Sequence, residues 1–245
     1  MIWTIARAAQ RGLLGRRRTG LMVAVAAIPV LIAAIVRASA ETSDAVPLTA
    51  GLHDGLVVRT VLPLVALVLG TAVLGSDLED GTAMYVLAKP IERWRIVVAT
   101  YLVAALPTAG LMGLVTLAAG LVVGGGRGAE GVAVAFAAGV AVGSLVYVAV
   151  FLALSVVTGR ALIVGLGYVL LWEGLLGGLL EGTAVLSIRQ YVLAIAKALA
   201  GRDGDAITVT FTFGGAVAIA LSALLLVGAI ALGTRRLARF EVRGD

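Results

Sequence analysis

Six long, mainly apolar stretches restrict what this sequence can fold into. A membrane-crossing α-helix needs about 20 such residues, so each stretch can supply one crossing. A transmembrane β-strand needs only about 10 residues of alternating polarity, and the stretches lack that alternation. The sequence therefore predicts an all-α integral membrane protein with six transmembrane helices, at 19–36, 56–76, 92–123, 131–158, 161–181 and 207–234.

Composition supports this prediction. The chain has 245 residues, of which 61% are hydrophobic and 13% are charged, whereas soluble domains carry about 25% charged residues. We interpret residues 1–245 as a single transmembrane domain. Because the chain has no cysteine and a single histidine, His53, we expect neither a disulfide nor a protein-bound metal.

Basic residues predict the orientation. Most of the 19 lysines and arginines fall on one side if both termini are cytosolic, as the positive-inside rule requires. The basic residues lie beside the apolar spans, where they set the orientation of a membrane protein. We therefore expect the lipid bilayer as a partner of the chain and no nucleic-acid partner. This topology predicts a multi-pass membrane protein with both termini in the cytosol, and we expect it in the plasma membrane (bacterial inner membrane).

Two helices are expected outside the spans. Residues 1–18 place apolar and basic side chains on opposite faces, which is typical of an amphipathic helix on the cytosolic membrane surface. Segment 182–206 repeats apolar residues at helical spacing and predicts an external helix between spans five and six. The glycines at 124–128 predict a tight external turn, whereas the pair Gly139 and Gly143 is a weak packing signal in so glycine-rich a chain.

Several residues inside or beside the spans leave alternatives open. Arg59, at the start of the second span, either extends its charge to the membrane surface or faces protein. Pro29, Pro63 and Pro107 predict kinks. Glu173, the one ionisable residue deep in an apolar stretch, is either a pathway or gate residue or a structural hydrogen-bonding group.

A dense polar insertion separates the second and third spans, at 76–95. Ser76 and Glu79 fit the capping box of a new helix, and Pro90 suits the first turn of a following one. The insertion therefore predicts a short cytosolic helix and then a sharp corner. No nucleotide-binding P-loop and no hydrolase or metalloprotease motif occurs in the sequence, so we expect no catalytic residue and no enzyme activity of the chain on its own.

The pattern Glu79-x-Gly81-Thr82 followed by Leu87-x-x-Pro90-x-x-Arg93 resembles the cytosolic loop of ABC-2 type transporter permeases. These are the six-span membrane subunits of ATP-binding cassette transporters. The resemblance extends to the order of the amphipathic helix, the spans and the external helix.

The resemblance implies that the insertion is a coupling helix which docks into a cleft of a separate ABC ATPase. That ATPase would bind ATP and Mg, and this chain would bind no cofactor. A homodimer, or a heterodimer with a similar permease, is also implied, and export is the expected direction. The residues expected to dock the partner are Glu79, Gly81, Thr82, Tyr85, Leu87, Pro90 and Arg93.

Two other functions fit the sequence. The chain could be a self-contained secondary transporter or channel, which would carry more ionisable groups within the membrane than Glu173 alone. It could also be a membrane scaffold for cytosolic partners. The substrate is not indicated by any motif.

Overall fold

The computed structural model describes residues 16–39, 44–79, 92–171, 187–209 and 213–238. Within these residues the protein is all-helical and contains no strand. The helices, in chain order, are α2 (Arg16–Ser39), α3 (Ala45–Leu52), the π-helix η1 (His53–Val61), α4 (Leu62–Glu79), α6 (Arg93–Gly124), α7 (Glu130–Val157), α8 (Ala161–Gly167), α10 (Ile188–Leu199), the 3₁₀-helix η4 (Gly201–Ala206) and α11 (Gly215–Ala238).

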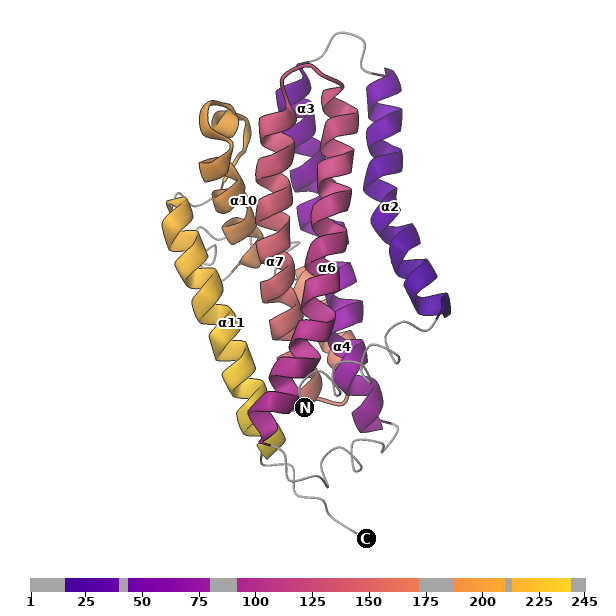
Figure 1. Cartoon of the computed structure of the whole chain (residues 1–245), viewed down its shortest axis with the longest axis vertical. Helices are drawn as coiled ribbons and strands as arrows, with labels where there is room; N and C mark the ends of the chain where they lie inside the picture. The colour runs from indigo at the N-terminus through magenta and orange to yellow at the C-terminus, as the bar shows by residue number, and fades with distance from the viewer. Residues whose placement is uncertain (1–15, 40–43, 80–91, 172–186, 210–212, 239–245) are drawn as a thin grey trace.

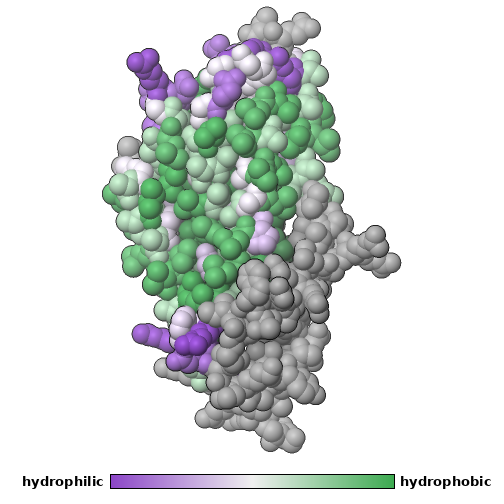
Figure 2. All heavy atoms as spheres, in the orientation of Figure 1, coloured by the Kyte–Doolittle hydropathy of each residue, from purple (hydrophilic) through white to green (hydrophobic). Residues whose placement is uncertain are grey.

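Four helices in the described part of the chain are long and apolar enough to cross a membrane. Those at Arg93–Gly124 and Glu130–Val157 agree closely with the predicted spans 92–123 and 131–158. The other two are Ala45–Ala72 and Gly215–Ala238. Polar surface lies at the two ends of the bundle and apolar surface between them (Figure 2). The protein is therefore built as an all-helical membrane protein.

Helix α7 is the centre of the bundle (Figure 1). It contacts α4, α6, α10 and α11, and its side chains Phe136, Tyr147 and Phe151 are fully buried. Helix α2 instead lies at the edge of the bundle against α6. An apolar side chain gains little from leaving lipid for protein, so close van der Waals contact must hold these helices together.

Glycines on α7 allow that contact. A Cβ atom at Gly139 would lie 2.8 Å from the carbonyl oxygen of Val192 in α10, and one at Gly143 would collide with the Val192 side chain. At Gly70 of α4, a Cβ atom would lie 2.9 Å from the Cβ of Phe151. The pair Gly139 and Gly143, a weak signal in the sequence, thus forms the surface on which α10 packs.

The second predicted span, 56–76, begins too late. Helical residues run without a break from Ala45 through η1 to Glu79. The count of uncharged residues missed the first turns because His53 and Asp54 interrupt it. The π-helix ends just before Pro63, whose ring would clash with the carbonyl of Arg59 in an ordinary α-helix. A wider, π-helical turn relieves such a clash. Prolines are a common cause of such irregular turns in helices.

The predicted capping box is wrong. Ser76 lies inside α4, which continues to Glu79, so neither residue begins a new helix. The pattern Ser-x-x-Glu can occur at the start of a helix or inside one. Here the apolar run before Ser76 continues the helix past this residue. The coupling segment that was predicted from residue 76 can begin only after α4 ends.

The last predicted span, 207–234, also differs. Residues Ile207–Val209 are not helical, and α11 begins at Gly215 and ends at Ala238. Apolar residues and threonines alternate at the start of this predicted span, so the sequence there has no apolar face at helical spacing. Helix α2 covers the first predicted span, and α8 begins the fifth at Ala161; most of residues 1–18 and the later part of span 161–181 lie outside the described residues.

The predicted helix within 182–206 is present as α10, and the glycine turn also forms. Gly125, Gly126 and Gly128 have φ values of 52°, 74° and 82°, which favour glycine. Helix α10 packs lengthwise along the half of α7 nearest Glu130, as its contacts at Gly139 and Gly143 require. It is part of the bundle wall.

The α7–α10 contact yields a prediction. Gly139→Ala should lower the free energy of unfolding by about 1–3 kcal/mol, because the added methyl meets backbone, which cannot rotate away. Thermal unfolding in detergent would measure it. Gly113→Ala is the matched control, since its Cβ would make only ordinary contacts of 3.6 and 3.7 Å. Equal destabilisation of both variants would contradict the packing role of Gly139.

Candidate functional site

The predicted partner-docking residues lie mostly outside the described residues. This holds for Gly81, Thr82, Tyr85, Leu87 and Pro90, and also for the predicted gate residue Glu173. The two that are described bracket the loop: Glu79 is the last residue of α4 and Arg93 is the first of α6. The loop therefore joins the ends of two neighbouring helices, since α4 and α6 are in contact.

The start of α6 is organised by one carboxylate. Glu92 forms an ion pair with Arg95 at 2.6 Å and accepts a hydrogen bond from the Trp94 indole nitrogen at 3.2 Å. The Arg95 guanidinium lies over the Trp94 ring, 5.4 Å from its centroid. These exposed groups give the corner after the loop a defined polar and aromatic surface, of the kind found where helices leave a membrane.

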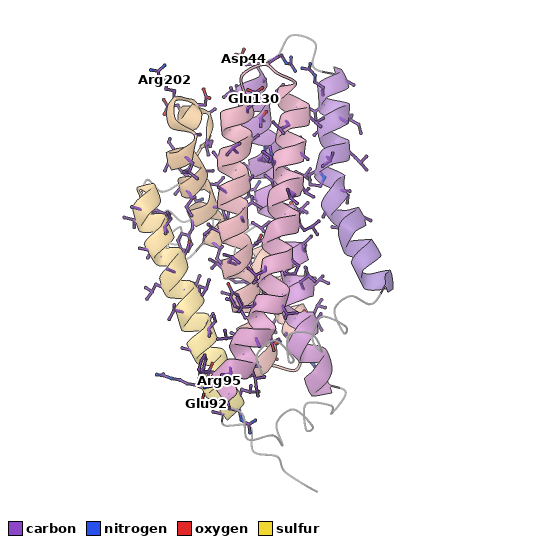
Figure 3. The ribbon with its side chains drawn as sticks, viewed as in Figure 1. Asp44, Glu92, Arg95, Glu130 and Arg202 are labelled. Atoms are coloured by element: carbon purple, nitrogen blue, oxygen red, sulfur yellow. The ribbon has the colours of Figure 1, made fainter. Side chains whose placement is uncertain are left out.

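The two ends of the bundle differ in charge. Glu92 and Arg95 lie at one end, and Asp44, Glu130 and Arg202 lie at the opposite end (Figure 3). Among the side chains that the structure describes, the first end carries five arginines and one carboxylate, whereas the opposite end carries both acids and bases. Described bases at the first end are Arg93, Arg95, Arg160, Arg235 and Arg236. This end, called the basic end below, is the one from which the loop emerges. It suits an acidic surface or anionic lipid headgroups.

A second polar site lies within the bundle and was missed in the sequence. Asp54 in η1 receives a two-pronged ion pair from Arg189 in α10. Arg189 Nη2 lies 2.7 Å from Oδ1 and 2.8 Å from Oδ2, and Nε lies 3.0 Å from Oδ1. The Arg189 side chain is only 11% exposed and that of Asp54 29%. Parallel hydrogen bonds of this kind are strong and directional, so they hold α10 against η1.

His53 precedes Asp54 and is fully buried. Its Nδ1 lies 2.6 Å from the Thr49 carbonyl oxygen, and its Nε2 lies 2.9 Å from that of Thr116 in α6. The ring stacks on Phe136 of α7 at 5.0 Å. Both neighbours are acceptors, so a neutral imidazole donates to only one of them, and the protonated ring satisfies both. His53 thus links η1 to the Thr49 carbonyl of α3 and the Thr116 carbonyl of α6 inside the bundle.

His53, Asp54 and Arg189 thus join three helical segments, α6, η1 and α10. No group of three potential ligands among the described residues could hold a metal ion. The sequence signal was available, because a His-Asp pair beside an apolar run needs partners if it enters the membrane. What the sequence did not reveal was the partner, Arg189, which lies 135 positions away.

Together these features define an all-helical membrane protein with a basic end and an internal ionisable cluster. No protein-family model matches the sequence, and a search of curated proteins finds no significant match.

The internal ion pair yields a prediction. Arg189→Gln should cost about 1–3 kcal/mol of unfolding free energy, because it leaves a partly buried carboxylate without its partner. Asp54→Asn should cost a similar amount. The double variant should lose clearly less unfolding free energy than the sum of the losses in the two single variants. A double-mutant cycle of unfolding in detergent measures this difference.

The exposed pair Glu92 and Arg95 provides the control. Its side chains are 46% exposed for Arg95 and 60% for Glu92, so the same cycle should give a coupling below about 1 kcal/mol. Additive losses for Asp54 and Arg189 would show that the two side chains act independently.

Proposed function

We propose that this protein is the permease subunit of an ATP-driven ABC transporter, with export as its direction. The observation that carries the proposal is the loop between Glu79 and Arg93. Its sequence resembles the coupling loop of ABC-2 permeases, and it emerges at the basic end of a helical bundle. Helices on both sides of the loop pack on α7, so force applied there reaches the centre of the bundle.

In this proposal Glu79 ends α4 and leads into the docking segment, Gly81 and Thr82 shape the start of that segment, and Tyr85 and Leu87 present its apolar face. Pro90 and Arg93 hold the corner that leads into α6. A separate ABC ATPase binds ATP and Mg, and a second permease chain, identical or similar, completes the pathway. The chain itself then has no catalytic residue.

Docking can be tested by changing the apolar face. The pair Tyr85→Asp and Leu87→Asp should reduce recovery of the co-expressed ABC ATPase by about tenfold or more, because burying two carboxylates in an apolar cleft is costly. Affinity purification of the permease in detergent measures the recovery. Stimulation of ATP hydrolysis on reconstitution should fall in parallel.

The matched control is Arg202→Glu, which alters charge at the opposite end of the bundle. It should leave recovery unchanged. Wild-type recovery of the ATPase with the Tyr85 and Leu87 double variant would refute docking through this loop. If the wild-type chain recovers the ATPase but does not stimulate its ATP hydrolysis, the result would instead favour a scaffold.

A second candidate function, a self-contained secondary transporter coupled to protons, is favoured by one observation. The span Ala45–Ala72 carries His53, Asp54 and Arg59, which are the additional ionisable groups that such a transporter needs. Both ring nitrogens of His53 face backbone carbonyl oxygens, which makes this residue the one to test for proton transfer.

This candidate predicts proton movement without nucleotide. Liposomes that contain the chain and a pH-sensitive dye should dissipate an imposed pH gradient faster than empty liposomes, and His53→Gln should remove the difference. Gln keeps a donor for one carbonyl and does not titrate. A gradient that decays equally with and without the wild-type chain would exclude this function.

A further inference from the structure

Aromatic and basic side chains gather where the start of α6 meets the end of α11. The two helices are in contact there, and a Cβ atom at Gly233 of α11 would lie 3.7 Å from Val97 Cγ1 of α6. Because α6 begins and α11 ends at the basic end, the residues just before Val97 and just after Gly233 lie together at that end (Figure 3). The exposed residues of this surface, called the α6–α11 corner below, are Trp94, Arg95, Arg235 and Arg236.

Glu92 organises the α6 side of the corner. It accepts the hydrogen bond of the Trp94 indole nitrogen and meets the Arg95 guanidinium at Nε, and that guanidinium lies over the indole ring. Ring and charge are thus held side by side, and each side chain is still 46% exposed. An indole, with an apolar ring and one polar edge, is typical of the boundary between membrane and water.

Both helices continue from the corner into exposed apolar faces. Helical spacing places Leu102 and Leu106 on the face of α6 that carries Arg95. The same spacing places Leu224 on the face of α11 that carries Arg235. All three leucines are exposed, and both helices are long and apolar enough to cross a membrane. In a bilayer these leucines face the hydrocarbon, so the corner lies at the level of the lipid headgroups.

The net charge around the corner is positive. The described side chains of the basic end include five arginines and one carboxylate, and Asp77 and Glu79 at the end of α4 reduce this excess without removing it. Segments 80–91 and 239–245 continue from this end and contain acidic and basic side chains in equal number, so they leave the net charge unchanged wherever they lie. Segment 172–186 carries two acids and leads into α10, in the other half of the bundle.

We propose that the α6–α11 corner binds the phosphate group of an anionic phospholipid in the membrane leaflet at the basic end. Arg235 and Arg236 donate hydrogen bonds to phosphate oxygens, a geometry that the guanidinium matches well. The acyl chains lie along the exposed leucines of α6 and α11, and Trp94 lies beside the headgroup.

The position of the leucines favours a lipid over a cytosolic protein. Arginines at headgroup level and leucines in the hydrocarbon match the two parts of one phospholipid, whereas a cytosolic partner meets the arginines alone. The net positive charge favours an anionic headgroup over a zwitterionic one. This inference rests on the membrane location of the helices and not on the transporter function proposed above.

The test measures binding of phosphatidylglycerol and phosphatidylcholine to the full chain in detergent by native mass spectrometry. Changing Arg235→Gln and Arg236→Gln together should weaken binding of phosphatidylglycerol by about tenfold, the combined effect of two bases at an anionic surface, and leave phosphatidylcholine unchanged. The double change to Lys should keep most of the preference, because it keeps the charge. Arg202→Gln, at the opposite end, is the matched control and should bind as the wild type does.

The fluorescence of Trp94 gives an independent measurement. The chain has three tryptophans, so Trp3→Phe and Trp172→Phe leave Trp94 as the single emitter. In liposomes, phosphatidylglycerol brominated near its headgroup should quench this emission more strongly than phosphatidylcholine brominated at the same carbon. The difference should disappear when both Arg235 and Arg236 are changed to Gln.

Four results would overturn the proposal. Equal affinity of the wild type and the Gln double variant for phosphatidylglycerol would show that the corner is no lipid site. Displacement of the lipid by millimolar inorganic phosphate would assign the corner to a free anion. With lipid binding unchanged in the Gln double variant, a loss of the co-expressed ABC ATPase would assign the corner to that partner, and a loss of a dimer would assign it to a second copy.

Discussion

Close contact between helix backbones around α7 is the constraint on which the rest of the structure depends. Apolar helices in lipid gain little from mutual burial, and they associate where small residues let them approach. Gly139 and Gly143 admit α10, and Gly120 of α6 lies against Ala133 of α7. Because the central helix touches its neighbours on several sides, a displacement of α4 or α6 is transmitted to α10 and α11 through tightly packed atoms.

The ionisable groups of the long helix from Ala45 to Glu79 lie in two different environments. Asp54 and His53 turn inward, where Arg189, Phe136 and two carbonyl oxygens satisfy them. Arg59, less than two turns further on, is exposed. Both positions lie in the π-helix η1, and Pro63 gives a physical reason for its location. Such irregular turns are often associated with function, and this one contains Asp54 of the internal ion pair.

The features behind the two candidate functions lie in different halves of the bundle. The basic end carries the loop that resembles a coupling element, and its arginines suit an acidic partner or anionic headgroups. The interior cluster lies in the other half, with α10 held to η1 by the Asp54–Arg189 pair. Both helices that flank the loop reach this cluster, because α4 is continuous with η1 and the Thr116 carbonyl of α6 lies 2.9 Å from His53 Nε2.

The amino-acid sequence by itself determined the fold class and the spans α6 and α7, since hydrocarbon thickness sets the length of an uncharged helical run. It also determined the glycine turn and the existence of α10, because positive φ and helical periodicity are local properties. The loop residues from Gly81 to Pro90 stay a prediction. Only the tertiary structure decided that the second helix begins at Ala45, that Ser76 lies inside α4, and that Gly139 and Gly143 receive Val192. The reason is physical: whether a charge or a glycine is tolerated in a membrane helix depends on the atom opposite it, and for Asp54 that atom belongs to a residue far along the chain.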